Sequence, residues 1–388
     1  MFNNLKIAFK DKSGADLNRA YFLFKIISIP IVSKILHQCV KLAIWLNLPI
    51  EGIIKHTIYK HFCGGTTIEN SQRTINKLWK SKIGTILDFS AEGKESQNDF
   101  DKVMKETIES IIEAKDNISI PFAVFKPTGL VKSSILEKMS NNIKLNQLEE
   151  RERERFKKRV KSICNAAKDN RVPVFIDAEE SWIQDAIDII ATKMMQKFNT
   201  KETWVFNTIQ LYRKDRIDYL KRIISDARNK GFLIGVKLVR GAYHEKEIAR
   251  AIEKQYTCPV HTNKEDTDKD YNQSLNICLE NIDIMSLCAG THNEESSSLL
   301  IKLMNKYKIE KEDKRIYLSQ LLGMSDNISY NAAERGFNTA KYVPYGPIKD
   351  LLPYLIRRAE ENTSISGQMG RELANIIAEK RRRKKEKN

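Results

Sequence analysis

The sequence lacks the short motifs that mark the commonest nucleotide-dependent and hydrolytic enzymes. It contains no GxGxxG after a strand candidate, no GxxxxGK[ST], no HExxH and no GxSxG. A Rossmann dinucleotide site, a phosphate-binding P-loop, a zinc protease and a serine hydrolase are therefore disfavoured. Of the six histidines only His292 follows a strand candidate. Because a metal site needs several converging ligands, the sequence predicts no bound metal.

Paired cysteines and a leader segment are also missing. The cysteines are scattered and form no CxxC pair, which in a chain of 388 residues favours unpaired thiols in a reducing compartment. The first residues, MFNNLKIAFKDKSGADL, have no apolar core and include acids, so neither a signal peptide nor a transit peptide is expected. These features predict a cytoplasmic protein. The cysteines are Cys39, Cys63, Cys164, Cys258, Cys278 and Cys288.

No apolar run approaches the ~20 residues that a membrane-spanning helix requires. The most apolar stretch, residues 26–54, is interrupted by Pro30, Lys34, Lys41 and Pro49. Its apolar residues recur at helical spacing. This pattern predicts accessory helices that pack on a larger domain, with contact at a membrane surface as the alternative.

Acidic residues are in deficit, with 50 Asp and Glu against 66 Lys and Arg, and the net charge of +16 suggests an anionic partner. Seven basic residues lie between Lys380 and Lys387. Because no aromatic residues interleave with these cations, nucleic acid is not expected as a partner. The tail instead predicts contact with an anionic membrane surface, with a frayed, solvated terminus as the alternative. The alternating charges of Arg151–Arg159 instead predict a solvated helix face with i,i+4 pairs.

From Gly84 onward short apolar runs alternate with longer helical segments, and eight runs in this order predict a (β/α)8 TIM-type barrel. A doubly wound open sheet stays possible from periodicity alone. The expected division is an N-terminal helical region (1–83), a barrel holding the site (84–363), and a C-terminal helix with a basic tail (364–388). The strand candidates are Gly84–Ser90, Phe122–Lys126, Val172–Asp177, Trp204–Leu211, Phe232–Val239, Ile282–Cys288, Ile316–Leu321 and Ala340–Val343. The helix candidates include Gln147–Lys168, Ile183–Phe198, Arg216–Lys230, Lys269–Asn281 and Glu295–Tyr307.

Nearly every strand candidate ends in a side chain that exchanges protons or hydrogen bonds. Barrel enzymes place their active sites at the carboxyl ends of the strands. The sequence therefore predicts a site there before any reaction is named. The strand-end residues are Asp88, Lys126, Asp177, Gln210, Lys237, Arg240, Thr291, His292, Gln320 and Tyr342.

A segment after the eighth strand candidate, GPIKDLLPYLIRRAEEN, carries adjacent arginines followed by an acid one turn later: Arg357, Arg358 and Glu361. Such a pair is ordinarily a solvated helix face. The apolar surroundings and the preceding YVPYG instead favour a carboxylate clamp, since a guanidinium binds a carboxylate through two parallel hydrogen bonds. Both interpretations stay open from the residues alone.

Seven motifs, one at each successive strand end from the second onward, resemble the proline dehydrogenase family. The N-terminal HFCGGTTIE and LDFSAEGKE also resemble its compact, single-activity bacterial form, and the resemblance covers residues 84–362. The chain is too short for the aldehyde-oxidising domain of bifunctional relatives. The motifs are KPTGL, IDAEES, IQLYRKD, KLVRGAY, GTHNEES, QLLGMSD and KYVPYGPIKDLLPYLIRRAEEN.

This resemblance implies a substrate site for L-proline. Arg357 and Arg358 would hold the proline carboxylate with Lys126, which Glu92 would keep charged. Tyr243 and Tyr342 would enclose the ring. The remaining substrate-site residues are Asp88 and Glu361, and the catalytic set is Lys126, Asp177 and Glu92.

The resemblance also implies FAD as cofactor. The residues expected around the isoalloxazine and ribityl are Asp177, Gln210, Lys237, Val239, Gly241 and Ala242, completed by Thr291, His292, Asn293 and Gln320. Those expected at the phosphates or adenosine are Thr262, Lys264 and Thr267. Two positions depart from the family pattern: Pro127, which pushes Lys126 toward an extended backbone, and His244.

The implied reaction is oxidation of L-proline to 1-pyrroline-5-carboxylate by hydride transfer from C5 to flavin N5, the first step of proline catabolism. Quinone is the implied electron acceptor, reached at a membrane surface. Hydroxyproline dehydrogenation is the nearest alternative, against which the bulk of Tyr342 argues. A Schiff-base aldolase using Lys126 is a second alternative.

Overall fold

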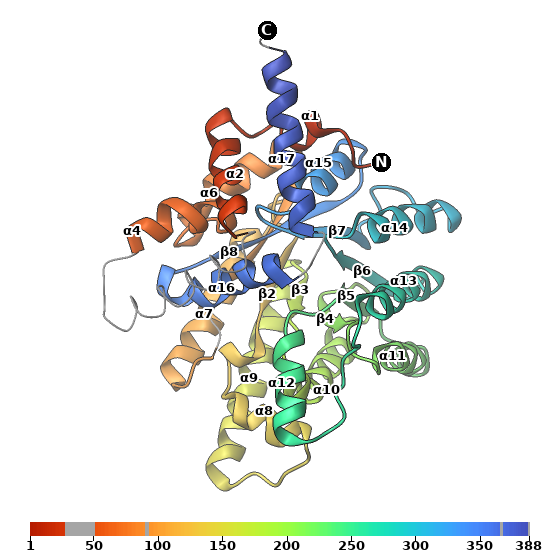
Figure 1. Ribbon diagram of the computed structural model, residues 1–388. Helices are drawn as coiled ribbons and strands as arrows, with labels where there is room; N and C mark the ends of the chain where they lie inside the picture. The colour runs from red at the N-terminus through yellow and green to blue at the C-terminus, as the bar shows by residue number, and fades with distance from the viewer. Residues whose placement is uncertain (28–50, 90–92, 365–367, 387–388) are drawn as a thin grey trace.

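The computed structural model describes residues 1–27, 51–89, 93–364 and 368–386, with the backbone alone for residues 27, 53, 359–364, 368 and 369. Eight parallel strands close into a barrel in chain order, which confirms the predicted fold class (Figure 1). The barrel closes between the first and last strands, from Ile83 beside Thr339 to Phe89 beside Tyr345. The strands are β1 Ile83–Phe89, β2 Phe122–Phe125, β3 Val174–Ile176, β4 Val205–Gln210, β5 Ile234–Val239, β6 Met285–Gly290, β7 Ile316–Leu321 and β8 Thr339–Tyr345.

Helices alternate with the strands and pack around the barrel (Figure 1). Those before the barrel are α1 Leu5–Ala8, α2 Gly14–Ile27, α4 Glu51–Ile54, the π-helical turn Lys55–Tyr59, α5 Lys60–Phe62 and α6 Ile68–Trp79. Those from the barrel onward are α7 Gln97–Ala114, α8 Ser133–Ser140, α9 Gln147–Asn170, α10 Ser181–Phe198, α11 Arg216–Lys230, α12 His244–Lys254, α13 Lys264–Glu280, α14 Glu294–Lys306, α15 Asp326–Glu334, α16 Ile348–Ser364 and α17 Gln368–Lys385.

Aromatic side chains fill the interior of the barrel. The rings of Phe122 and Phe175 stack with centroids 4.5 Å apart, and Phe206 meets both edge-on. Tyr317 approaches Phe122 edge-on at 4.8 Å. Offset-stacked and edge-to-face pairs are the arrangements that aromatic quadrupoles favour, so these rings form a packed floor rather than a channel. Polar groups at the carboxyl ends of the strands lie above that floor.

The predicted elements are confirmed, with shifts at some of their ends. The helix predicted from Lys269 begins at Lys264, because the Asn263 side chain accepts a hydrogen bond from the Asp266 amide and caps the earlier start. The sixth strand begins at Met285 rather than Ile282. Residues 282–284 instead form a turn closed by a bond from the Ile284 amide to the Asn281 carbonyl.

The interpretation of Arg151–Arg159 as a solvated face is wrong for one residue. Arg159 is buried, and its guanidinium donates to Asp101 at 2.7 Å and to the Leu130 carbonyl at 3.1 Å. The exposed pairs are spaced i,i+3 rather than i,i+4, with Arg153 beside Glu150 and Lys157 beside Glu154. The charge alternation therefore hid one buried contact between α9 and α7.

The N-terminal helices and α17 form a second apolar cluster beside the barrel, to which α2, α5, α16 and α17 contribute. Figure 1 shows α17 rising next to α1 and α2, and it packs against both. Most of the stretch predicted as accessory helices, residues 28–50, lies outside the described residues. In the described part of the chain no helix has the length and apolar character needed to cross a membrane.

Candidate active site

The carboxyl ends of β1, β2 and β3 bring two carboxylates to one ammonium group. Lys126 Nζ lies 3.2 Å from both carboxylate oxygens of Asp88 and 3.5 Å from Asp177 Oδ2. Lys126 has an extended backbone (φ −103°, ψ 130°), as predicted from the following Pro127, which opens a single 3-10 turn. The backbone at the end of β2 therefore has the conformation that a following proline favours.

Asp177 is the centre of the cluster. Its Oδ1 accepts from Lys237 Nζ of β5, and both its oxygens lie within 3.0 Å of the Tyr342 hydroxyl of β8. Lys237 Nζ also donates to the Tyr342 oxygen at 2.9 Å and lies 5.2 Å from the Phe175 ring centre. Five strands (β1, β2, β3, β5 and β8) thus share one polar network directly above the aromatic floor.

The charges of this cluster determine the protonation states of Asp177 and Tyr342. Burial alone would raise the pKa of Asp177, but the positive charges of Lys237 and Lys126 and the hydrogen bonds from Lys237 and Tyr342 hold it below its usual value. Burial and the Asp177 carboxylate raise the pKa of Tyr342 well above its usual value. Asp177 is therefore an anion and Tyr342 a neutral hydroxyl that donates to it.

Amide side chains lie at the ends of β4 and β7 toward the barrel mouth, at Gln210 and Gln320, and both donate to backbone carbonyls. Gln210 donates to the Glu179 carbonyl at 2.6 Å. Gln320 donates to the Thr291 carbonyl at 3.1 Å and accepts from the Ser329 hydroxyl at 2.7 Å. Both amides are almost fully buried, so each is fixed in place beside the barrel mouth.

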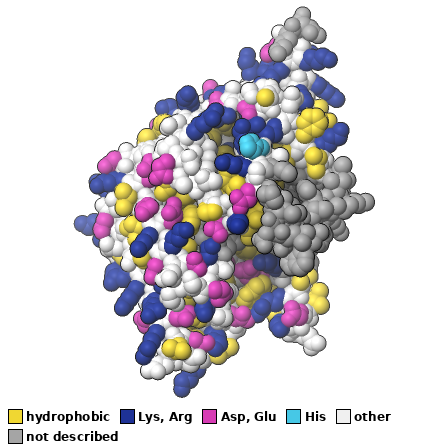
Figure 2. All heavy atoms as spheres, turned by 90° about the vertical axis from the view of Figure 1, so that its left-hand side faces the viewer, with side chains coloured by type: hydrophobic (Ala, Val, Ile, Leu, Met, Phe, Trp, Pro, Cys, Tyr) yellow, Lys and Arg dark blue, Asp and Glu magenta, His cyan; other side chains and the backbone are white. Residues whose placement is uncertain are grey.

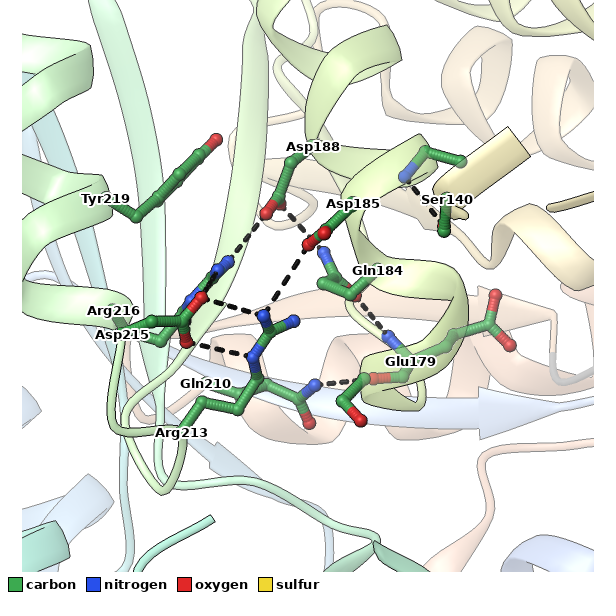
Figure 3. A network of polar contacts seen from close by, with 12 residues as sticks. Ser140, Glu179, Gln184, Asp185, Asp188, Gln210, Arg213, Asp215, Arg216 and Tyr219 are labelled. Carbon is green, nitrogen blue, oxygen red and sulfur yellow. Dashed lines mark hydrogen bonds and ion pairs between the residues drawn. The ribbon is translucent and has the colours of Figure 1, made fainter. Parts of the chain in front are cut away.

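A buried network behind β3 and β4 supports this arrangement (Figure 3). The Glu179 amide donates to Gln184, whose side chain donates to Asp188 at 2.9 Å. Asp188 accepts in turn from Arg216 at 2.6 Å. The Glu179 carboxylate accepts from the Thr128 amide at 2.8 Å and from its hydroxyl. This network ties the loops after β2 and β3 to α10 and α11.

The loop after β6 is organised around Arg240. Its guanidinium donates to Thr291 at 2.6 Å and to Asp268 at 2.6 Å, and it lies 4.4 Å from the centre of the Tyr271 ring. Asn293 caps α14 by accepting from two backbone amides, at 2.8 and 3.1 Å. Thr291 and Asn293 are therefore held in fixed positions next to His292.

The loop after β5 needs glycine at one position. Gly241 has φ +136°, and a Cβ there would lie 2.5 Å from the Tyr212 ring. Val239 before it is half-buried and Ala242 after it is exposed. Tyr243 is buried at the start of α12. The exposed residues Gly241 and Ala242 thus lie between the end of β5 and the start of α12.

The adjacent arginines lie on α16, which follows β8. The Arg357 guanidinium is 5.8 Å from the centre of the Tyr243 ring, and Arg358, which is 6% exposed, is 5.3 Å from that of Tyr354. The interpretation of this pair as a solvated face is therefore wrong for Arg358. Glu92 and the side chain of Glu361 lie outside the described residues.

The residues expected at the phosphates or adenosine lie at the start of α13. Thr262 is exposed, and Lys264 is exposed and pairs with Asp268 one turn along. Thr267 is buried. Asp268 also accepts from Arg240, so this segment adjoins the loop after β6 without joining the cluster around Asp177.

Several residues of the mouth were missed from the sequence. Glu179 lies in the IDAEES motif, and its position two residues beyond Asp177 was the available signal. Lys341, fully buried, pairs with Asp326 at 2.9 Å, and alternation along β8 indicated only that it points away from Tyr342. Ser325 lies in the strand-end motif QLLGMSD, which was the available signal. Glu372 carried none, since nothing in its local sequence links it to the barrel mouth.

The donor set suits a flavin. Isoalloxazine presents carbonyl oxygens and ring nitrogens, and the mouth offers amides at Gln210 and Gln320, an ammonium at Lys237 and a hydroxyl at Thr291. The exposed residues Gly241 and Ala242 follow β5 next to Lys237. Among the described residues no three His, Cys, Asp or Glu side chains are grouped as metal ligands.

Comparison with known proteins agrees with this geometry. The sequence model described as proline dehydrogenase matches residues 71–371. The chain is 33% identical to the carbapenem antibiotics biosynthesis protein CarD of Pectobacterium carotovorum (83% of each chain) and 32% identical to mitochondrial proline dehydrogenase 1 of Dictyostelium discoideum (92% of this chain, 70% of that one). It is 29% identical to hydroxyproline dehydrogenase of Xenopus laevis (97% and 88%).

Solved structures share the fold. Proline utilization A from Bdellovibrio bacteriovorus, inactivated by N-propargylglycine, superposes with a TM-score of 0.73 at 20% identity. The match covers 94% of this chain and 38% of that one, so the present chain corresponds to a minor part of the larger protein.

Proposed function

The chain belongs to the proline dehydrogenase family, and from this premise we propose that it oxidises L-proline to 1-pyrroline-5-carboxylate with FAD as cofactor. The observation that carries the proposal is the buried cluster of Lys126, Asp177, Lys237 and Tyr342 at the carboxyl end of the barrel. It lies where barrel enzymes hold substrate, and it combines a fixed anion with two cations. FAD, when bound, supplies the two-electron acceptor that these side chains lack.

Arg357 and Arg358 would bind the substrate carboxylate, and Lys126 would add a third positive charge. Two features support this assignment: Arg358 is nearly buried, and α16 follows directly after the strand that carries Tyr342. A bidentate arginine contact fixes both the position and the tilt of a carboxylate. Tyr243 and Tyr342 would enclose the ring. Asp88 and Glu92 would hold Lys126, and Glu361 would complete the site.

Lys237, Gln210 and Gln320 would bind the isoalloxazine, with the backbone of Val239, Gly241 and Ala242 beside it. The ammonium of Lys237 would stabilise negative charge on the reduced ring, since a fixed cation favours electron density nearby. Thr291, His292 and Asn293 would complete the flavin site. Thr262, Lys264 and Thr267 would meet the phosphates or adenosine.

The substrate amine must lose a proton before or during hydride loss. The cations Lys126, Arg357 and Arg358 surround the place where we put that amine, and positive charges lower the pKa of a neighbouring ammonium. Asp177, held as an anion, would orient Lys237 and Tyr342 rather than accept the proton. The residues therefore bind, orient and favour the neutral amine.

Hydroxyproline is the second candidate substrate, because the Xenopus relative of that name matches 97% of this chain. The ring of Tyr342, anchored by its hydroxyl to Asp177 and Lys237, would crowd a 4-hydroxyl group. A Schiff-base mechanism at Lys126 is disfavoured, since two carboxylates accept from its ammonium and a Schiff base requires the neutral amine.

The reoxidant we propose is a membrane quinone, reached by peripheral contact with an anionic surface. The exposed cations of α17, namely Arg381, Lys384 and Lys385, would supply the attraction. Figure 2 shows Lys and Arg side chains gathered at the projecting end of the molecule, where α17 lies.

The decisive experiment is the absorption spectrum of the purified protein, followed by anaerobic addition of L-proline. The proposal expects a flavin spectrum that bleaches with L-proline, and FAD released by acid in near-stoichiometric amount. Faster bleaching with hydroxyproline than with L-proline would show that hydroxyproline is the preferred substrate. A colourless folded protein that FAD does not reconstitute would reject the proposal.

A further inference from the structure

The loop between β7 and α15, residues 322–325, is held from three sides. Lys341 of β8 donates to the Met324 carbonyl at 2.5 Å and to the carbonyl of Leu321, the last residue of β7, at 3.3 Å. The His61 ring contacts the carbonyl of Gly323 at 2.9 Å. Glu372 of α17 accepts from the Ser325 amide at 2.6 Å. The last residue of this loop is therefore placed by elements from both ends of the chain.

Ser325 connects Glu372 of α17 to His292. Its hydroxyl lies 3.2 Å from Glu372 Oε1 on one side and 3.0 Å from His292 Nδ1 on the other. Its backbone is left-handed (φ 49°, ψ 43°), a conformation that is costly for a residue with a Cβ. Such a conformation persists only where surrounding contacts over-determine it, and the bond to Glu372 is one such contact.

The protons along this chain of contacts can be counted. A backbone N–H only donates, so the bond from the Ser325 amide makes Glu372 Oε1 an acceptor. The Ser325 hydroxyl donates its one proton to that same oxygen. With that proton committed, the contact to His292 requires the imidazole to donate from Nδ1.

We infer that Glu372 is a positioning residue that acts through Ser325 to hold His292 as the Nδ1–H tautomer, with Nε2 left as a hydrogen-bond acceptor. Burial, with the charges of Lys341, Arg358 and Arg240, lowers the pKa of His292 to about 3, in keeping with a neutral ring. The inference rests on the proposed function in one respect: it takes Nε2 of His292 to face the bound flavin.

Histidine ring nitrogens report the tautomer directly by NMR. In protein labelled at histidine, as purified, the His292 signal, assigned by its loss in His292→Asn, should show a proton on Nδ1. Glu372→Ala and Ser325→Ala should shift this signal toward a mixture of tautomers. Glu372→Gln should keep it, because the amide oxygen still accepts from both Ser325 donors. Arg371→Gln, one residue away on α17 and paired at 3.3 Å with Glu294, is the matched control.

The same variants should weaken FAD retention in the order of the NMR effect, by roughly tenfold for Glu372→Ala. A proton on Nε2 in the unmodified protein, or an unchanged His292 signal in both Glu372→Ala and Ser325→Ala, would overturn the inference. If Glu372→Ala does not fold, Ser325→Ala decides alone. A confirmed tautomer shift in protein that binds no flavin would reject the proposed function and leave the coupling intact.

Discussion

At the scale of single residues, one carboxylate organises the site. Asp177 accepts from Lys237 and Tyr342 and lies 3.5 Å from Lys126, so its lone pairs are largely committed within the protein. A carboxylate so engaged is a poor general base and a strong orienting group. We therefore assign the binding of substrate to the cations around it.

Replacement of Arg358 by alanine should reduce kcat/KM for L-proline by roughly thirtyfold to several thousandfold. Loss of one member of a buried charge pair costs about 2–5 kcal/mol, and Arg358 is 6% exposed. Steady-state kinetics with L-proline measure the effect. Lys349→Ala is the control, since it removes an exposed cation from the same helix. Kinetics unchanged in both Arg358→Ala and Arg357→Ala would refute the carboxylate clamp.

Replacement of Tyr342 by serine should relax discrimination against hydroxyproline, because it removes the ring from the substrate pocket. Tyr342→Phe keeps the ring and removes the hydroxyl that donates to Asp177, so it should lower the rate with both substrates and leave their ratio near the original. The measurement is the ratio of kcat/KM for the two substrates. An equal ratio in the serine variant and the unmodified enzyme would show that Tyr342 does not line the substrate pocket.

Much of this site was predictable from sequence because strand ends of a parallel barrel meet at one rim. Asp88, Lys126, Asp177, Lys237 and Tyr342 follow from that rule alone, and the structure brings all five together. Which of them pair was not predictable, since pairing depends on side-chain reach across the barrel. The coupling of Glu372 to the mouth depends on how a helix beyond the barrel docks, for which local patterns carry no signal.

At the scale of elements, α17 is bound to the N-terminal helices by polar contacts as well as apolar packing. Arg383 donates to the carbonyls of Phe9 and Lys12, both at 2.7 Å. Glu379, fully buried, accepts from Arg383 and from Arg382. The basic tail predicted from composition is thus divided between residues with structural partners and residues exposed to solvent.

Arg383→Ala should lower the free energy of unfolding by about 2–3 kcal/mol, since hydrogen bonds from a charged donor contribute about 1.5–3 kcal/mol. Urea unfolding followed by circular dichroism measures the change. Arg381→Ala removes an exposed cation two residues earlier and should leave the midpoint unchanged. Equal midpoints for the two variants would mean that the contacts to Phe9 and Lys12 do not stabilise the docked helix.

Elements were more predictable than their ends. Arg216–Lys230 and Ile316–Leu321 match the predicted ranges, because hydrophobic periodicity changes sharply at their boundaries. The start of α13 differs by five residues, because its first turn is polar and only the Asn263 cap defines it. Caps depend on backbone geometry that periodicity does not report.

At the scale of the whole molecule, the charge of +16 should produce salt-dependent binding to anionic vesicles. Substitution of the exposed cations of α17, Arg381, Lys384 and Lys385, by glutamine should weaken binding roughly a hundredfold, at about 1 kcal/mol for each residue near the surface. Sedimentation with vesicles across a salt series measures it, since binding should fall as the Debye length shrinks.

Lys115→Gln/Lys168→Gln/Lys221→Gln is the control for net charge, because it removes three exposed cations from other parts of the surface. Equal weakening in the two triple variants would mean that overall charge, not α17, drives binding. No sedimentation of either protein after reduction by proline would reject the peripheral contact itself. Substitution is preferable to truncation, since a shortened chain also loses Arg383 and its structural bonds.

The contact of Arg383 with the carbonyls of Phe9 and Lys12 has a consequence for synthesis on the ribosome. Chains emerge from the N-terminus at roughly 5–20 residues per second, and early segments ordinarily fold first. Here the N-terminal helices cannot make their contacts with α17 until α17 has emerged. In the same way, β1 cannot pair with β8 until β8 has emerged. The N-terminal helices and β1 therefore gain their last native contacts only near the end of synthesis.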